Sequence, residues 1–80
     1  MLPKSILAQR ARHKALLDAY GIHQADAADR AGVPRPYVSQ YFRGRVNLTL
    51  DEFTRLRDAI RELVVEAEAR QKAAREAGTP

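Results

Sequence analysis

The polar side chains best placed to do chemistry fall in one short stretch, residues 35–43. If this stretch is helical, Val38 and Tyr41 lie one turn apart on an inward face, which leaves the outer face to other residues. The outer face then carries Pro36, Tyr37, Ser39, Gln40 and Arg43. Glutamine pairs best with adenine and arginine with guanine, so such a face suits DNA. The sequence contains no nucleophile–base pair, glycine-rich phosphate loop or metal-ligand spacing, and this indicates binding and not catalysis.

Residues 24–41 predict the two short helices and the tight turn that hold this face in place. Gly32 can adopt the positive φ that a sharp helix end needs, and Val33 follows it as an apolar plug. The motif is a small residue, a glycine and two apolar residues, which follow one another at intervals of four, six and three positions. It consists of Ala28, Gly32, Val38 and Tyr41. This pattern is typical of a DNA-binding helix-turn-helix.

With the flanking segments included, the sequence resembles the lambda-repressor-like helix-turn-helix family, which includes Cro and the phage repressors. Residues 21–24, Gly-Ile-His-Gln, are similar to the family's Gly-Leu-Thr/Ser-Gln opening. Residues 42–45, Phe-Arg-Gly-Arg, and residues 47–50, Asn-Leu-Thr-Leu, resemble its glycine corner and the entry to its next helix. The similarity covers roughly residues 16–60. It implies an all-α fold with double-stranded DNA as the partner.

The resemblance also implies roles for single residues. Base edges in the similar repressors are read from the first two residues of the recognition element and from one turn later. These positions are Arg35, Pro36, Ser39 and Gln40. The positions that grip phosphates are Gln24, Arg43, Arg45 and Asn47, to which Tyr37 can add a hydroxyl. Whether Arg35 contacts a base or a phosphate stays open, and each of these residues could also be an ordinary exposed polar residue.

The helix starts around the turn depart from the family pattern. A residue before a proline is pushed out of the α region, so Arg35 is expected to be an extended N-cap with its side chain free. The recognition helix is then expected to run from Pro36 to about Arg43 and to stop at Gly44. His23 occupies the N-cap of the preceding helix, although histidine caps poorly.

Length and composition favour one small domain, residues 1–80. The chain has 80 residues and no cysteine, so neither a disulfide nor a thiolate metal site can brace its small core. The net charge is +4, and residues 1–49 carry eight basic and three acidic residues against six and seven in residues 50–80. The basic excess therefore accompanies the helix-turn-helix, as a phosphate-binding face requires, or it marks a generally basic surface. With no signal peptide and no apolar run near 18 residues, we expect a soluble, cytoplasmic protein without membrane contact.

Residues 5–20 predict a first helix that Ser5 caps and Gly21 ends. Its basic side chains are expected opposite an apolar face, where they either reach the DNA backbone or are solvated. They are Arg10, Arg12 and Lys14. His13 and His23 are ten residues apart without acidic or cysteine partners, and both are expected to be surface histidines.

A long helix is predicted over residues 50–77. Thr49 and Glu52 form a capping box, Leu48 and Phe53 are placed as a hydrophobic staple, and no glycine or proline follows until Gly78. The family usually breaks here. The part after residue 65 is expected to lie too far out to cover the core, so its alanine stripe is either a dimer arm or a solvated helix. The dimer interface expected from it is Leu63, Val64 and Ala67.

These features predict a small dimeric repressor of a phage, plasmid or other mobile element that binds an inverted-repeat operator. No cofactor, metal or small-molecule effector is expected. Two alternatives remain. One is an antitoxin that represses its own operon, and the other is a protein-interaction adapter that uses the helix-turn-helix as a scaffold.

Overall fold

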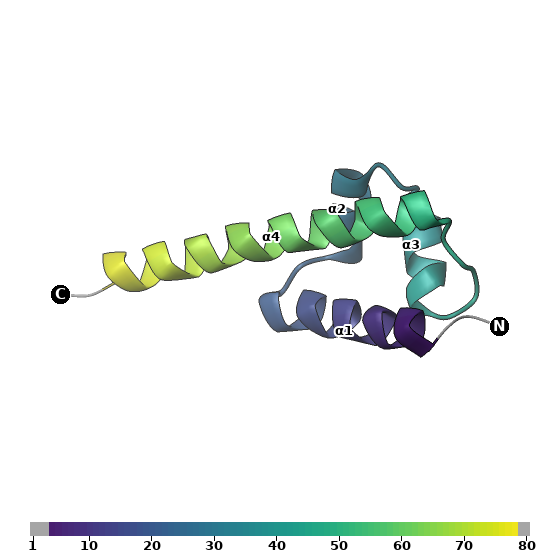
Figure 1. The fold of residues 1–80 in the computed structure, drawn as a ribbon. Helices are drawn as coiled ribbons and strands as arrows, with labels where there is room; N and C mark the ends of the chain where they lie inside the picture. Colours follow the sequence, from purple (N-terminus) through teal and green to yellow (C-terminus); the bar gives the residue numbers. More distant parts are fainter. Residues whose placement is uncertain (1–3, 79–80) are drawn as a thin grey trace.

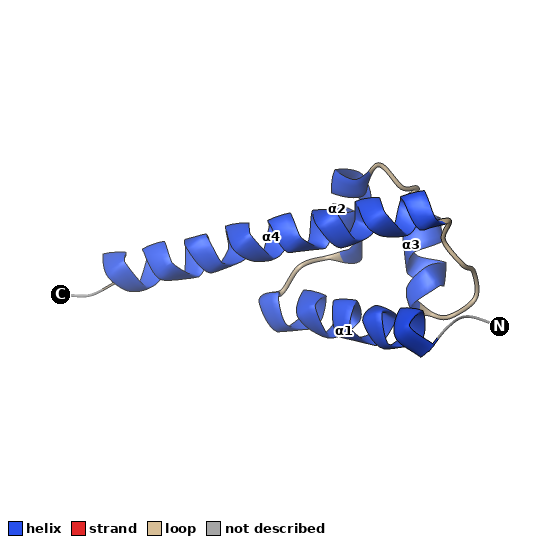
Figure 2. Ribbon diagram, viewed as in Figure 1, coloured by secondary structure: helices blue, strands red, loops and turns tan. Residues whose placement is uncertain are grey.

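The computed structural model describes residues 4–78, and this part of the chain folds into four α-helices without a strand. They are α1 (Lys4–Tyr20), α2 (Gln24–Ala31), α3 (Arg35–Phe42) and α4 (Leu50–Ala77). The expected all-α fold is confirmed (Figure 2). The helix α4 packs against α1 and α2, while α3 packs against α2 and α1 (Figure 1). The two short helices therefore pack against each other, with α2 also held by α4 and α3 also held by α1.

The first helix differs at its start from the expectation. It already includes Lys4, so Ser5 lies inside α1, and the prediction that Ser5 caps the helix is wrong. An N-cap residue must have non-helical backbone angles, and a helical Ser5 does not have them. The other end is as expected, because α1 ends at Tyr20 and Gly21 follows it.

The core forms where α1, α3 and α4 meet, and α2 contributes only small side chains to it. The largest fully buried side chains are Tyr41, Leu17, Leu56, Ile60 and Val38. From α2 come three buried alanines, Ala27, Ala28 and Ala31, which allow its backbone to approach its neighbours closely. The inward orientation expected for Val38 and Tyr41 is confirmed.

His13 belongs to this core as well, so the expectation of a surface histidine is wrong there. Its side chain is only 7 % exposed, and its ring centroid lies 5.8 Å from that of Phe53. The reason is helical spacing, because His13 precedes the buried Leu17 by four residues and shares its face of α1. The other histidine, His23, is exposed as expected.

The long helix α4 runs unbroken over 28 residues. The capping box is present at its start: the Glu52 N–H donates to Thr49 Oγ1 over 3.1 Å, and the Thr49 N–H donates to Glu52 Oε1 over 2.9 Å. At 1.5 Å per residue the helix is about 42 Å long. The molecule measures 54 Å in its longest dimension, and the second half of α4 projects beyond the other helices (Figure 1).

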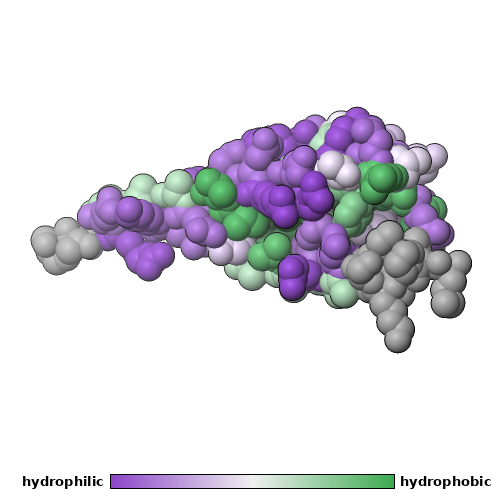
Figure 3. Space-filling model, in the orientation of Figure 1, coloured by the Kyte–Doolittle hydropathy of each residue, from purple (hydrophilic) through white to green (hydrophobic). Residues whose placement is uncertain are grey.

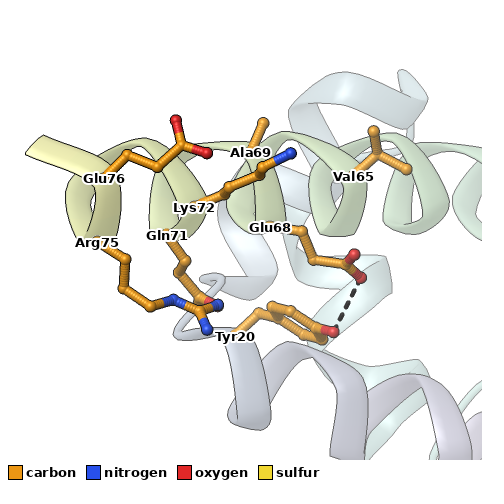
Figure 4. A pocket seen from close by; sticks show the side chains of 8 residues that line it. All are labelled: Tyr20, Val65, Glu68, Ala69, Gln71, Lys72, Arg75 and Glu76. Atoms are coloured by element: carbon orange, nitrogen blue, oxygen red, sulfur yellow. Dashed lines mark hydrogen bonds between the residues drawn. The ribbon is translucent and has the colours of Figure 1, made fainter.

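The body of the domain supports α4 further along its length than the sequence indicates. Ala67 is only 3 % exposed, and the Tyr20 hydroxyl at the end of α1 donates to Glu68 Oε1 over 2.9 Å (Figure 4). Leu63 and Val64 are partly buried against the core. The expectation that α4 leaves the core at residue 65 is therefore wrong, and Ala67 offers almost no apolar surface to a partner.

Candidate nucleic-acid interface

The turn between α2 and α3 is closed by two backbone hydrogen bonds around Gly32. The Gly32 N–H donates to the Asp29 carbonyl over 3.3 Å, and the Val33 N–H donates to the Ala28 carbonyl over 3.1 Å. This is the Schellman arrangement, which places one residue in the left-handed region. Gly32 has φ +70°, where a side chain is strained. Val33 is 4 % exposed and plugs the turn onto the core, as the sequence predicts.

The recognition helix α3 begins one residue earlier than expected. Pro34, with φ −54° and ψ 134°, is the N-cap, and its carbonyl accepts from the N–H groups of Tyr37 and Val38. Arg35 is thus the first helical residue, and the prediction that it is an extended N-cap is wrong. Pro36 becomes the second helical residue, where its missing N–H costs nothing because that position has no acceptor within the helix.

The side chain of Arg35 is held in place instead of being free. Its Nε donates to Asp29 Oδ1 over 2.9 Å, and its Nη2 donates to Asp29 Oδ2 over 2.6 Å. Both side chains remain more than half exposed. The hydrogen bonds from Arg35 hold the pKa of Asp29 below its ordinary value of 3.8. At neutral pH the pair is therefore fully ionised, and it links the first residue of α3 to the last turn of α2.

Most of the remaining outer face of α3 is open. Pro36, Tyr37 and Gln40 are exposed, while Ser39 is partly buried. Gln40 lies one turn beyond Pro36, so the two share one stripe of the helix. The structure thus brings the residues expected to read bases onto one accessible surface, with Ser39 at its edge.

The residues that follow α3 form a second tight corner. The Gly44 N–H donates to the Tyr41 carbonyl over 3.0 Å, and the Arg45 N–H donates to the Gln40 carbonyl over 2.9 Å. Gly44 has φ +77°, so a left-handed residue again ends the helix. Arg43, Arg45 and Asn47 are all exposed around this corner. Three of the residues expected to grip phosphates therefore lie next to the C-terminus of α3.

Arg10 also belongs to this corner, although the sequence groups it only with the other basic residues of α1. Its guanidinium carbon lies 6.0 Å from the centre of the Tyr41 ring, and a Cβ added at Gly44 would be 3.4 Å from Arg10 Nη1. The absence of a side chain at Gly44 thus leaves room for the Arg10 head group. Sequence spacing alone cannot reveal this, because 34 positions separate the two residues.

The charge on this surface is not neutralised at the corner. Within the described part of the chain, neither Arg43 nor Arg45 makes an ion pair, whereas other arginines do. Arg30, for example, donates to Glu66 over 2.6 and 3.1 Å. The cations left without a carboxylate near α3 are therefore available to phosphate groups.

The two further residues of the expected phosphate set are Gln24 and Tyr37. Gln24 is the first residue of α2, where the backbone N–H groups have no acceptor within the helix, and it follows His23, whose side chain makes no capping hydrogen bond. Tyr37 and Asn47 line one hollow of about 410 Å³ together with the start of α4. Tyr37 and Asn47 thus lie side by side next to the outer face of α3, while Gln24 is partly buried at the start of α2.

A short helix, a glycine turn and a second helix with an open polar face define a DNA-binding helix-turn-helix domain. Consistent with this geometry, a family model described as helix-turn-helix matches residues 14–62, which is more than half of the chain. The chain belongs to the lambda-repressor-like helix-turn-helix family, whose members are DNA-binding regulators and not enzymes. No curated protein and no solved structure matches the chain.

Neither a metal site nor a membrane span is found in the described range. Residues 4–78 contain no cluster of three or more histidine, cysteine or acidic side chains that could hold a metal ion. None of the helices described in that range is long and apolar enough to cross a bilayer.

Proposed function

We propose that this DNA-binding regulator is a sequence-specific transcriptional repressor, of the kind that phages, plasmids and other mobile elements use. The observation that supports it most directly is the open polar face of α3 beside two arginines without carboxylate partners, Arg43 and Arg45. A protein bound over a promoter in this way occludes the polymerase. Its occupancy then follows its own concentration.

In this proposal α3 enters the major groove and its outer face reads bases. Gln40 is the best candidate for direct readout, because it is exposed and its amide can pair with adenine through two hydrogen bonds. Ser39 contributes a hydroxyl from the edge of the face, and Pro36 contacts a thymine methyl group. Arg35 reads a base with the N–H groups that Asp29 leaves unused.

The backbone contacts surround this helix. Arg43, Arg45 and Asn47 bind phosphates on one side, and Tyr37, which lines a hollow together with Asn47, adds its hydroxyl there. Gln24 and the start of α2 bind a phosphate on the other side. Arg10 joins the first group through its position over Tyr41 and Gly44. Contacts of this kind fix the orientation of the protein on the duplex.

A dimer formed through α4 would let the repressor recognise enough base pairs to identify one site. One domain of this size reads too few base pairs to find a site in a genome, whereas two copies on a two-fold axis read an inverted repeat. Leu63 and Val64 flank the proposed interface, and Val65 is its centre because this side chain is 66 % exposed. Figure 3 shows an apolar patch on α4 near the point where it leaves the body of the domain.

A hollow beside this patch offers space for the second helix. It has a volume of about 740 Å³ and lies between the end of α1 and the projecting half of α4 (Figure 4). Val65 and Ala69 provide apolar lining, while Glu68, Lys72 and Arg75 provide charges of both signs. A second copy of α4 in antiparallel orientation can complement these charges, as paired helices commonly do.

The salt dependence of DNA binding tests this function. Association constants of the parent and of Arg43→Ala are measured by fluorescence anisotropy on a labelled duplex at several salt concentrations. Loss of one phosphate contact should reduce the slope of log K against log salt by about 0.9. The control is Arg70→Ala, which removes the same charge from an exposed position on the projecting part of α4. Equal slopes for the parent and Arg43→Ala would show that the assigned DNA face is wrong.

A further inference from the structure

A second group of cationic side chains lies between α1 and α4, apart from the residues to which the proposed function gives a contact with DNA. They line a hollow of about 330 Å³. Leu16 and Ile60 give it an apolar floor, and three arginines line it from both helices. They are Arg12 from α1 and Arg57 and Arg61 from α4. None of these residues belongs to the helix-turn-helix or to the corner after it.

The charge of this hollow has little compensation within the protein. Among the described residues, Arg12 and Arg61 make no ion pair. Arg57 has only its sequence neighbour Asp58, at 3.4 Å, which is long for a hydrogen bond between charged groups. Like charges brought together at one hollow repel each other, so an anion between them is favoured.

The three arginines also lie close to a buried histidine, His13. This residue lines the hollow and is 7 % exposed, yet its Nδ1 is buried without a hydrogen-bond partner. Burial, followed by repulsion from Arg57, Arg61 and Arg12, lowers the pKa of His13 from its ordinary value of 6.5. The neutral ring keeps one N–H to donate. An anion held in the hollow would lie close to the His13 ring, because this ring is part of the lining.

We propose that the hollow between α1 and α4 binds a small phosphate-bearing compound, which Arg12, Arg57 and Arg61 hold over the ring of His13. The planar guanidinium forks match phosphate oxygens in pairs, which an ammonium group cannot do. The volume exceeds that of a lone phosphate, and the floor of Leu16 and Ile60 accepts an apolar part of the same compound. Such a ligand bridges α1 and α4 and stabilises the domain by mass action.

The test follows the His13 ring by NMR while inorganic pyrophosphate is added to the full chain, with sodium chloride at matched ionic strength as the reference. Pyrophosphate should shift the ring signals saturably and raise the pKa of His13, because the bound anion opposes the repulsion from the arginines. Arg61→Gln should weaken the binding by about tenfold or more, since it removes charged hydrogen bonds. The control Arg70→Gln changes the same charge on the same helix outside the hollow and should leave binding within about twofold.

Three results would overturn the proposal. The first is an equal shift of the His13 signals with sodium chloride. The second is an equal loss of pyrophosphate affinity in Arg61→Gln and Arg70→Gln. Either result would show that the anion responds only to the overall charge of the protein. The third uses a random-sequence duplex in place of pyrophosphate. If the duplex shifts the His13 signals in the same way, and Arg61→Gln abolishes that shift, then the hollow binds the DNA backbone and not a small compound.

Discussion

Arg35 and Asp29 form a two-bonded ion pair across the helix-turn-helix, with N–O distances of 2.9 and 2.6 Å. The pair places a carboxylate beside the first residue of the recognition helix. A carboxylate at this position repels phosphates and uses two of the five N–H donors of the arginine. We infer that Asp29 restrains Arg35 from binding any phosphate within reach and so favours selective base contacts.

The first prediction removes this restraint. Asp29→Asn should bind random DNA more tightly, discriminate less between sequences, and show a slope of log K against log salt that is steeper by up to about 0.9, because Arg35 gains a phosphate contact. Anisotropy titrations on random and selected duplexes measure both effects. Asp18→Asn, an exposed acid on α1, is the control for the change in net charge. Unchanged affinity for random DNA would show that Asp29 has no such role.

The second prediction concerns base readout by α3. Gln40→Ala should lose about 1–3 kcal/mol at one base position in each half-site and little at the others, because a paired amide contact to a single base is lost. Binding to a set of duplexes with single substitutions gives the loss at each position. A uniform loss at every position would make Gln40 a backbone contact.

The sequence predicts the fold well because its strongest signals are local. The glycine turn at Gly32, the capping box of Thr49 and Glu52, and the run without glycine or proline up to Gly78 all depend on residues a few positions apart. Each of them is present in the structure. The local rules failed at Arg35, because the helix could begin after Pro34 or at Pro36. The ion pair with Asp29 is compatible with the start after Pro34, in which Arg35 is helical.

The features that the sequence could not predict depend on contacts between distant segments. Ala67 is buried by the body of the domain, and helical periodicity cannot tell how far along α4 that body reaches. Arg10 over Gly44 and His13 beside Phe53 join α1 to residues about 34 and 40 positions away. Single-sequence patterns contain no information about such pairs. The DNA-facing residues were assigned through the family resemblance, and their roles remain predictions.

The third prediction follows from the buried His13. Its pKa in the folded protein is lowered, so below pH 6.5 the unfolded chain binds more protons at this residue than the folded chain. The contribution of His13 to the free energy of unfolding should therefore be constant above pH 6.5 and should fall as the pH decreases below it. Thermal unfolding between pH 5 and 8 measures the trend. His13→Leu should remove this part of the pH dependence, whereas the exposed His23→Gln should keep it.

The fourth prediction concerns the dimer. Val65→Glu should give a monomer with weak operator binding, because it places a charge at the centre of the proposed interface. Leu63 is less suitable for this test, since it packs against the core and its substitution also affects folding. Sedimentation measures the oligomeric state, and Ala15→Glu, an exposed site on α1, controls for the added charge. A Val65→Glu variant that stays dimeric would eliminate this interface.

We propose that this chain recognises a specific DNA sequence through α3 as a two-fold dimer. The most direct test is selection of bound duplexes from a random pool by the purified protein, followed by footprinting of the enriched site. We expect an enriched inverted repeat whose half-site centres lie about 10 base pairs apart, or a low multiple of that, because two recognition helices must enter successive major grooves. A pool without any enriched sequence would contradict sequence-specific binding, and a single half-site or a direct repeat would contradict the two-fold arrangement.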